Sequence, residues 1–273
     1  MLAVVTGASS GIGREIAFEL AKRGWDLILV SRSKENLQKL QNAIIKMQSE
    51  RKPHWRSKSI EIFPLDLSKR NNCKLLYAAG RGRSVDLLVN CAGFGEFGEF
   101  VYTNLENEQN MIDLNVVALH TLTKLYLKDF VKQDHGKILN VSSLAGFTSG
   151  PMLSTYYATK AYVLNLSLAI YEELRVRKSG AKIYVLCPGP VNSGFDERAG
   201  VDFSLKGMDP KRVAKFALAR MNYDEPIIIP YDKSNWYLCF MPLVVRLVPT
   251  KVMLKICRLF QNQKKKEIRR RKV

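Results

Sequence analysis

Short apolar runs that alternate with amphipathic segments constrain this chain most. Between the runs, Ile12, Ile16 and Leu20 share the spacing of one buried helix face, and Gly24 supplies a natural stop. Apolar strands separated by helices predict a parallel sheet covered on both faces, so we expect a doubly wound α/β fold. The expected strands are Leu2–Thr6, Leu27–Val30, Ile60–Leu65, Val85–Asn90, Lys137–Val141, Ile183–Cys187 and Ile227–Ile229.

Length and composition fit one large domain. With 273 residues and 47% hydrophobic content, the chain can bury a substantial core. We expect a catalytic domain over residues 1–235, followed by an apolar and amphipathic extension with a basic tail over residues 236–273. The N-terminal residues read as a first strand rather than a signal peptide, so we expect the body of the protein in the cytoplasm. The five cysteines and three histidines are scattered, and we expect neither a disulfide framework nor a metal site.

A glycine-rich loop joins the first expected strand to the first expected helix. Its glycines suit a tight turn, a close approach of backbone to a pyrophosphate, and close packing of helix on strand. The unpaired N–H groups of the helix N-terminus then face the phosphates. This context predicts a dinucleotide-binding loop whose contact residues are Gly7, Ser9, Ser10, Gly11, Ile12 and Gly13.

The end of the second strand indicates which cofactor is bound. An acidic residue there would bind a ribose 2′-hydroxyl, whereas a basic residue would pair with a 2′-phosphate. Val30 is followed by Ser31 and Arg32, with no carboxylate, and a guanidinium fork suits phosphate. We therefore predict NADP(H), with Arg14 and Lys34 as auxiliary cations or as ordinary solvated charges.

Tyr156 and Lys160 lie four residues apart and so share one helix face. A free tyrosine titrates near ~10, and a neighbouring ammonium would lower its pKa toward the working range. The pair is a candidate proton switch, although Tyr-x-x-x-Lys also arises by chance on surface helices.

Several further motifs occur with this pair in one order between residue 2 and about residue 195. Together they closely resemble the classical short-chain dehydrogenase/reductase family, which implies a single Rossmann-like domain and hydride transfer with a nicotinamide cofactor. The motifs are the glycine loop, Asp66-Leu67, Asn90-Cys91-Ala92-Gly93, Asn115, Asn140-Val141-Ser142-Ser143, Tyr156 with Lys160, and Pro188-Gly189-Pro190-Val191.

The resemblance implies a catalytic tetrad. By it, Ser143 would bind the substrate oxygen, Tyr156 would transfer the proton, Lys160 would acidify Tyr156 and hold the nicotinamide ribose, and Asn115 would help to position a water. Tyr157 and Ser142 are adjacent alternatives. Only Tyr156 lies four residues from Lys160, and strand alternation would send the hydroxyls of Ser142 and Ser143 to opposite faces.

The resemblance also implies cofactor contacts beyond the glycine loop. The adenine would lie near Asp66 and Leu67, and its ribose beside the wall from Asn90 to Gly93. Cys91 stands where the family often has asparagine, and Ser193 where threonine is commoner. The full set of implied contacts adds Asn90, Ala92, Gly93, Tyr156, Lys160, Pro188, Gly189, Val191 and Ser193.

The expected substrate mouth is rich in apolar residues, which predicts an apolar carbonyl substrate such as a fatty acyl, sterol-like or retinoid-like ketone. The other interpretation is that several of these side chains simply pack in the core. The resemblance implies a homodimer or homotetramer. The apolar residues are Phe94, Phe97, Phe100, Phe147, Met152, Phe195 and Phe203.

The C-terminal part is strongly basic. Residues 246–273 hold eleven Lys or Arg and one Glu, which is +10 of the net +18. Lys251, Lys255 and Arg258 recur at helical spacing among apolar residues and predict a cationic amphipathic helix. It could lie on an anionic membrane surface, cover the substrate pocket, or pack against a second subunit.

Three classes of function remain. The leading one is an NADP(H)-dependent oxidoreductase that interconverts a carbonyl and a secondary alcohol. The alternative is a catalytically silent nucleotide-binding sensor or scaffold at a membrane surface, against which the complete tetrad argues. Nucleic-acid binding is not expected, because no aromatic residues are interleaved with the charges of the tail.

Overall fold

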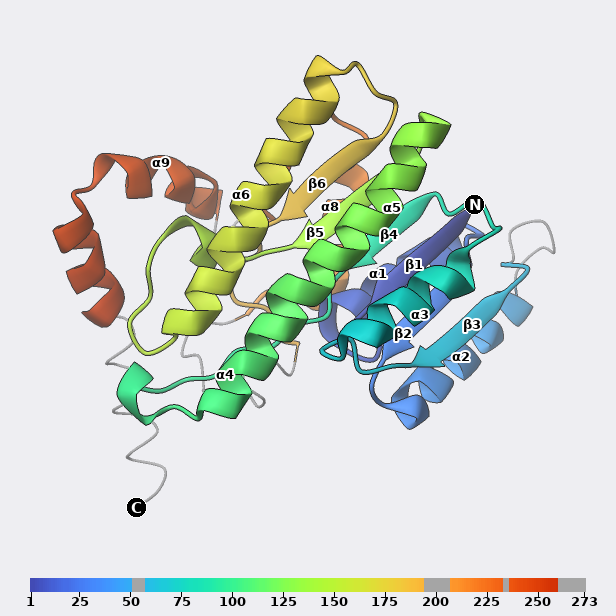
Figure 1. Ribbon diagram of the computed structural model, residues 1–273, viewed down its shortest axis with the longest axis horizontal. Helices are drawn as coiled ribbons and strands as arrows, with labels where there is room; N and C mark the ends of the chain where they lie inside the picture. The colour runs from blue at the N-terminus through green and yellow to red at the C-terminus, as the bar shows by residue number, and fades with distance from the viewer. Residues whose placement is uncertain (51–56, 194–206, 233–235, 260–273) are drawn as a thin grey trace.

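A seven-stranded parallel sheet forms the centre of the protein (Figure 1). The computed structural model describes residues 1–50, 57–193, 207–232 and 236–259. The strand order is β3-β2-β1-β4-β5-β6-β7, which confirms the doubly wound fold. The strands are β1 (Leu2–Thr6), β2 (Asp26–Ser31), β3 (Ile60–Pro64), β4 (Leu87–Asn90), β5 (Lys137–Val141), β6 (Lys182–Leu186) and β7 (Ile227–Ile228).

Helices cover both faces of the sheet. In Figure 1, α3, α5 and α6 cross in front of the strands, whereas α1 and α8 lie behind them. Each face has its own apolar core, because the strands are buried on both sides. The helices are α1 (Gly11–Lys22), α2 (Lys34–Ser49), α3 (Arg70–Gly80), α4 (Leu105–Ile112), α5 (Leu119–Gln133), α6 (Ser154–Val176) and α8 (Pro210–Arg220).

The expected strands agree with the observed ones to within two residues. The differences lie at the strand ends; for example, Val85 and Asp86 precede β4 rather than forming its start. Shorter elements lie near the carboxyl edge of the sheet: the 3₁₀ helices η2 (Phe100–Tyr102) and η4 (Leu144–Phe147), and a π-helical turn, η3 (Asp113–Ala118).

The order in which the strands are added reverses between β1 and β4. The chain first builds outward from β1 to β2 and β3, and then returns to the other side of β1, where β4 to β7 follow. In open parallel sheets, ligands bind at the carboxyl ends of the strands at such a switch. The glycine loop and the end of β4 both lie at this edge.

The described residues beyond β7 add no strand to the sheet. They contain η5 (Trp236–Phe240), α9 (Met241–Leu247) and a helix over residues 250–259, which includes most of the predicted amphipathic helix. Phe260 and the basic residues after it lie outside the described residues. In the described part of the chain, we find no helix that is both long and apolar enough to cross a bilayer.

Candidate active site

The glycine loop has the shape that a pyrophosphate needs. Gly7 has φ of +66°, and a Cβ there would lie 2.9 Å from Ala92 Cα. Gly11 has φ of +54°, and a Cβ on Gly13 would lie 2.5 Å from the carbonyl oxygen of Gly7. A side chain at any of these positions would therefore collide with neighbouring protein atoms, so only glycine allows this close packing. This glycine cradle ends at the N-terminus of α1, whose first turn holds no acidic residue, and so it fits an anionic dinucleotide.

Thr6 ties the cradle to the neighbouring strand. Its hydroxyl donates to the Val89 carbonyl at 3.2 Å and accepts from the N–H groups of Cys91 and Ala92 at 3.0 and 3.1 Å. The wall from Asn90 to Gly93 is thus held beside the glycine loop. Sequence reasoning did not assign Thr6 a role, although its place directly before Gly7 is the signal that could have found it.

Arg32 lies at the end of β2 with an exposed side chain. Within the described residues it forms no ion pair. Ser31 donates to the carbonyl of Ser33 at 3.4 Å, and Ser33 caps α2 by accepting from the Asn36 N–H. Arg14, one of the expected auxiliaries, lies 3.7 Å from Glu15 and stacks on Phe18. Arg32 is therefore the better placed cation for a phosphate.

Three residues expected near the adenosine of the cofactor have side chains that already contact other parts of the protein. Asp66 accepts from both the N–H and the hydroxyl of Ser68, and Leu67 is buried in the core. The Asn90 amide points inward and donates to Thr123 and Asn140 at 3.0 and 2.9 Å. Contact with a cofactor at Leu67 and Asn90 would therefore come from backbone atoms rather than from side chains.

Ser143 and Tyr156 meet above β5. The Ser143 hydroxyl accepts from the Ala145 N–H at 3.1 Å, donates to the Pro188 carbonyl at 3.4 Å, and is hydrogen-bonded to the Tyr156 phenol. Ser142, by contrast, is buried and donates to the Lys160 carbonyl at 2.7 Å. The two neighbouring hydroxyls thus point to opposite sides, as strand alternation predicts, and only Ser143 meets the phenol.

Lys160 lies beneath the Tyr156 ring. Its ammonium donates to the Val141 carbonyl at 2.9 Å and lies 5.7 Å from the ring centroid. Burial lowers the pKa of Lys160 to about 8.

The expected acidification of Tyr156 is not found in this structure. Burial raises the pKa of the phenol, the hydrogen bond with Ser143 lowers it, and Tyr157 raises it further. The ammonium of Lys160 does not lower the pKa of this phenol. Desolvation of the phenol therefore outweighs any attraction from the ammonium.

Asn115 lies in the π-helical turn and links three segments. Its amide donates to the Phe94 carbonyl at 2.9 Å and to the Thr159 hydroxyl at 3.1 Å, and its oxygen accepts from the Phe94 N–H. Thr159 in turn donates to the Tyr156 carbonyl at 2.7 Å. The loop after β4, η3 and the Tyr156 turn of α6 are thus joined through one buried side chain. Sequence reasoning did not predict the π-helical turn, for which the sequence carries no plain signal.

The segment after β6 completes this edge of the sheet. Val191 forms an isolated bridge with Met208, and Ser193 approaches Gly11 closely, since a Cβ on Gly11 would lie 2.7 Å from Ser193 Cβ. A Cβ on Gly189 would lie 3.1 Å from Leu238, in η5. The segment after β6 therefore contacts the glycine loop on one side and the C-terminal extension on the other.

The apolar residues of the expected substrate mouth have different environments. Phe94 and Phe97 are half-buried, Phe147 packs against a core cluster, and Phe100 is exposed. Met152 has φ of +71°, and its carbonyl accepts from the Gly98 N–H at 2.8 Å. Phe195 and Phe203 lie outside the described residues. Phe147 thus fits the core interpretation, whereas Phe94 and Phe97 follow directly after the cofactor wall.

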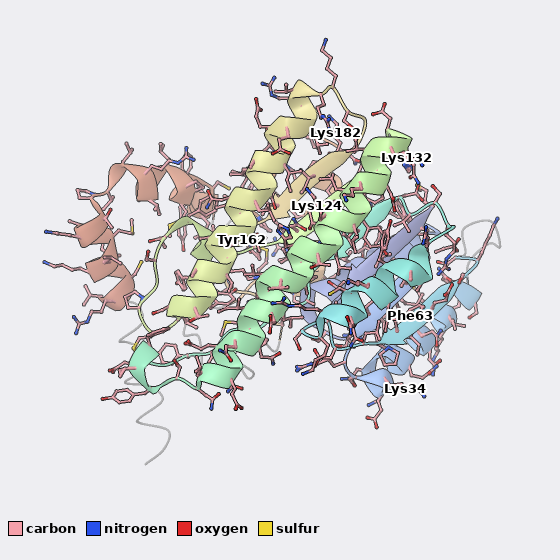
Figure 2. All side chains as sticks on the ribbon, viewed as in Figure 1. Lys34, Phe63, Lys124, Lys132, Tyr162 and Lys182 are labelled. Carbon is pink, nitrogen blue, oxygen red and sulfur yellow. The ribbon has the colours of Figure 1, made fainter. Side chains whose placement is uncertain are left out.

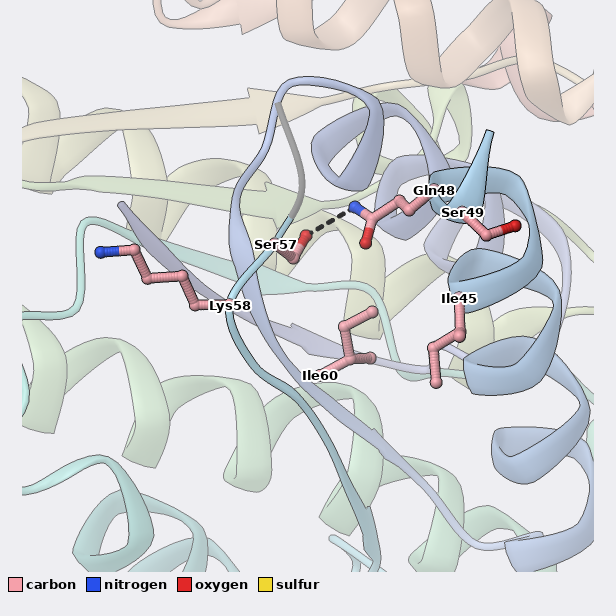
Figure 3. Close-up of a pocket in the computed structure, with 6 residues that line it drawn as sticks. All are labelled: Ile45, Gln48, Ser49, Ser57, Lys58 and Ile60. Atoms are coloured by element: carbon pink, nitrogen blue, oxygen red, sulfur yellow. Dashed lines mark hydrogen bonds between the residues drawn. The ribbon is translucent and has the colours of Figure 1, made fainter. Parts of the chain in front are cut away.

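A second depression lies away from the candidate active site (Figure 3). It lies between α2 and the segment that leads into β3, holds about 300 Å³, and is bridged by a hydrogen bond of 2.8 Å from Gln48 to Ser57. The side chains that line it include none of the expected site residues. Among the residues that the structure describes, no cluster of His, Cys, Asp or Glu could hold a metal ion.

Comparison with known proteins agrees with this geometry. The profile of the short chain dehydrogenase family matches residues 1–202. The chain belongs to the short-chain dehydrogenase family. Its glycine cradle and its Ser143, Tyr156 and Lys160 cluster both lie inside the matched region.

Two curated members of the short-chain dehydrogenase family show the degree of similarity. The chain is 33% identical over 186 residues to very-long-chain 3-oxoacyl-CoA reductase of Mycosarcoma maydis, covering 67% of this chain and 51% of the relative. It is 30% identical over 223 residues to human 17-beta-hydroxysteroid dehydrogenase type 3, covering 81% of this chain and 67% of the relative. The chain thus spans about half to two thirds of the length of these relatives.

A solved short-chain dehydrogenase covers more of the structure. The enzyme from Sphingobium yanoikuyae, in complex with NADPH, superposes with a TM-score of 0.77 at 29% identity and covers 91% of this chain and 96% of that chain. The similarity therefore extends over the whole sheet and its helices.

Proposed function

We propose that the protein is an NADP(H)-dependent oxidoreductase that interconverts a carbonyl and a secondary alcohol on an apolar substrate. One observation carries the proposal. The Ser143 hydroxyl is hydrogen-bonded to the Tyr156 phenol, above the ammonium of Lys160 and at the same edge of the sheet as the glycine cradle. Two hydroxyl donors therefore converge at the place where a substrate oxygen would meet a bound dinucleotide.

The residues of this cluster would handle the oxygen of the substrate. A nicotinamide cofactor, when bound, supplies or accepts the hydride at the carbonyl carbon. During reduction the carbonyl oxygen gains negative charge, and the Ser143 hydroxyl donates a hydrogen bond to it while the Tyr156 phenol gives it a proton. Oxidation reverses these transfers, with the phenolate of Tyr156 taking the proton from the alcohol.

Lys160 and Asn115 would support this proton transfer. Lys160 keeps its ammonium 5.7 Å from the centroid of the Tyr156 ring, and Asn115 holds the loop after β4 against α6. Because burial raises the pKa of Tyr156, the phenol is protonated at neutral pH and holds the proton that reduction of a carbonyl consumes, although a raised pKa also makes it a weaker acid. This state suits carbonyl reduction.

The apolar substrate is supported by two kinds of observation. Half-buried Phe94 and Phe97 follow the wall beside the glycine loop. The similar proteins include one named for a very-long-chain 3-oxoacyl-CoA and one named for a hydroxysteroid. A fatty acyl or sterol-like ketone is the substrate class that we propose for this chain. Retinoid-like ketones belong to the same panel of probes.

The test is NADPH oxidation by purified protein with a panel of ketones. We expect turnover to rise from small polar ketones to long-chain and steroidal ones. Tyr156→Phe should lower kcat by roughly 10²-fold to 10⁴-fold, because the proton donor is lost. Tyr157→Phe is the matched control and should keep kcat within a few-fold of wild type.

Three results would count against the proposal. A preference for small polar ketones would overturn the substrate class. Equal turnover by wild type and Tyr156→Phe would overturn the catalytic assignment. Binding of NADPH without turnover of any ketone would instead support the silent nucleotide-binding sensor or scaffold.

A further inference from the structure

Residues 236–259, which we call the C-terminal extension, pack one side against loops of the candidate site. Leu238 lies over Gly189, after β6, and the Cys257 sulfur lies 3.9 Å from the Thr148 hydroxyl, after η4. Met253 is only 7% exposed. In Figure 1 the extension lies at one side of the molecule, beside α6 and away from β3. It therefore covers part of the same edge of the sheet that holds Ser143.

The other side of the extension is an exposed apolar surface. Soluble proteins rarely leave large neighbouring apolar side chains in water, and such patches mark contacts with proteins or membranes. Here Leu247 is 73% exposed and Leu259 is 65% exposed, and both aromatic and aliphatic side chains take part. The exposed residues are Trp236, Tyr237, Phe240, Leu243, Val244, Leu247, Val252, Ile256 and Leu259.

The helix over residues 250–259 carries three stripes. Met253 and Cys257, four residues apart, face the protein. Two further stripes are exposed. An apolar one holds Val252, Ile256 and Leu259, and a cationic one holds Lys251, Lys255 and Arg258. The outward residues of a helix that only covered the protein would be mainly polar. An apolar stripe that adjoins the exposed side chains of η5 and α9 therefore indicates a further partner.

Charge identifies that partner. The extension holds four Lys or Arg residues, Arg246 included, and no Asp or Glu, and the whole chain carries a net charge of +18. A second copy of the chain would bring the same cations to a shared symmetric interface, where like charges repel. A surface that is both apolar and negatively charged fits all three stripes, and an anionic lipid bilayer has this chemistry.

We propose that the C-terminal extension docks the protein peripherally on an anionic lipid bilayer. The apolar stripe, with the side chains of η5 and α9, enters the boundary between headgroups and acyl chains, and the cationic stripe binds lipid headgroups. The aromatic residues Trp236 and Tyr237 suit this boundary, since each has an apolar ring with a polar group.

Docking has a consequence for the candidate site, which rests on the proposed function. The inner side of the extension contacts the loops at Gly189 and Thr148. Thr148 follows Ser143 in the same segment, and Gly189 follows Pro188, whose carbonyl accepts from the Ser143 hydroxyl. A docked extension therefore holds the site close to the bilayer surface. An apolar ketone dissolved in the membrane could then reach the enzyme without crossing water.

The experiment is co-sedimentation of the full chain with vesicles of phosphatidylcholine alone or with about 30% phosphatidylserine, whose charge attracts Lys and Arg near the surface. We expect wild type to pellet mainly with the anionic vesicles, and less in high salt. Leu247→Glu with Leu259→Glu should weaken binding to them by roughly tenfold or more. Lys251→Gln, Lys255→Gln and Arg258→Gln together should remove the preference for phosphatidylserine.

Leu75→Glu with Val176→Glu is the matched control. Leu75 is 58% exposed on α3 and Val176 is 69% exposed on α6, so the pair resembles the extension pair in exposure but lies elsewhere. The control should pellet as wild type does. Circular dichroism should show the same helix and strand content in all variants.

Three outcomes would overturn the docking proposal. Wild type could remain in the supernatant with both kinds of vesicle, or the Leu247 and Leu259 variant could pellet as well as wild type. Alternatively, that variant could convert an oligomer to a monomer while no form binds vesicles, which would make the extension a subunit interface. Turnover of a water-soluble ketone without vesicles is measured separately, so that failure of docking and failure of the proposed function are distinguishable.

Discussion

Lys160 lowers the stability of the fold, although the proposed reaction needs its charge. Its side chain is 7% exposed, yet the proposed chemistry needs its positive charge close to Tyr156. Burial disfavours the charged form, which is why its pKa falls to about 8. At neutral pH the buried ammonium therefore lowers the free energy of unfolding, which an apolar side chain of similar shape would not do.

We predict that Lys160→Met stabilises the fold at neutral pH and abolishes turnover. The unfolded ammonium titrates near 10.5 and the folded one near 8, so below pH 8 both states hold the proton and the cost of burial is complete. The cost disappears as pH rises from about 8 to 10.5. We expect a gain of roughly 1–3 kcal/mol at pH 7, after allowing for the lost hydrogen bond to Val141, in urea unfolding.

The pH dependence separates this mechanism from a general effect of adding Met. The gain should shrink toward zero near pH 10.5, whereas an equal gain at both pH values would contradict the assignment to Lys160 titration. Lys124→Met, on the exposed side of α5 (Figure 2), is the control and should change stability little at either pH.

Arg32 is the residue on which the cofactor prediction depends. A charge-assisted contact with a 2′-phosphate contributes about 1.5–3 kcal/mol, and a carboxylate would repel that phosphate. Arg32→Glu should therefore lower the ratio of kcat/KM for NADPH to that for NADH by roughly a hundredfold or more. Arg177→Glu, exposed beyond α6, should leave the ratio unchanged. An unchanged ratio in Arg32→Glu would refute the prediction.

At the level of elements, the π-helical turn η3 decides how the site is assembled. It interrupts the path from α4 to α5 and places Asn115 between the loop after β4 and α6. Single π-helical turns within α-helices often lie at functional sites. Here the turn lets one amide bind a backbone segment and a side chain of another helix together.

Thr159→Val tests this assembly, because it keeps the shape of the side chain and removes only the hydroxyl. The Asn115 amide then loses one of its two acceptors, and the Tyr156 turn loses its link to η3. We expect kcat to fall by about tenfold to a hundredfold and the unfolding free energy to fall by about 1–2 kcal/mol.

A rescue variant and a control variant show whether the Thr159 hydroxyl itself is responsible. Thr159→Ser restores the hydroxyl and should recover most of the activity. Thr121→Val removes a hydroxyl on α5 that donates to the Val117 carbonyl in η3 but does not contact Asn115 or the Tyr156 turn, and it should affect stability but not kcat. Full activity in Thr159→Val would show that the turn does not position Tyr156.

The elements that the sequence predicted best are those whose pattern is set by burial alone. Strands β1 and β5 match their predicted bounds, because apolar β-branched runs have no other stable place than a covered sheet. Burial of a strand is a local rule that one segment obeys by itself. The pairing of Ser143 with Tyr156, by contrast, was implied by the family resemblance, and strand alternation only favoured Ser143 over Ser142.

Other features depend on contacts between distant segments and could not be predicted. The Asn90 amide turns inward because Thr123 and Asn140 from other elements reach it. The pKa of Tyr156 is raised because the fold buries the phenol, whereas the spacing to Lys160 alone predicted the opposite direction. The roles of the expected cofactor residues stay predictions, which the Tyr156 and Arg32 variants can check.

At the level of the whole molecule, the division into residues 1–235 and 236–273 is still a prediction. A chain that ends at Asn235 should fold cooperatively, since the extension adds no strand and Met253 is its most buried apolar side chain. We expect a loss of about 1–3 kcal/mol from that burial, measured by urea unfolding.

A second truncation provides the contrast. A chain that ends at Asn222 also lacks β7, which pairs with β6, and should lose much more stability. If the chain ending at Asn235 fails to unfold cooperatively, the proposed boundary is wrong. The expected homodimer or homotetramer is likewise a prediction, which sedimentation equilibrium of the full chain can check.

The central place of β1 also affects how the protein is made in a cell. Val5 pairs with Leu29 on one side but with Val89 on the other, so the second partner is synthesised much later than the first. At roughly 5–20 residues per second, a ribosome needs several seconds to add the missing strand. During this time a strand that is apolar from Leu2 to Val5 has an unpaired edge, which is prone to aggregation. We therefore expect the newly made chain to depend on chaperones that bind extended apolar segments until β4 has emerged.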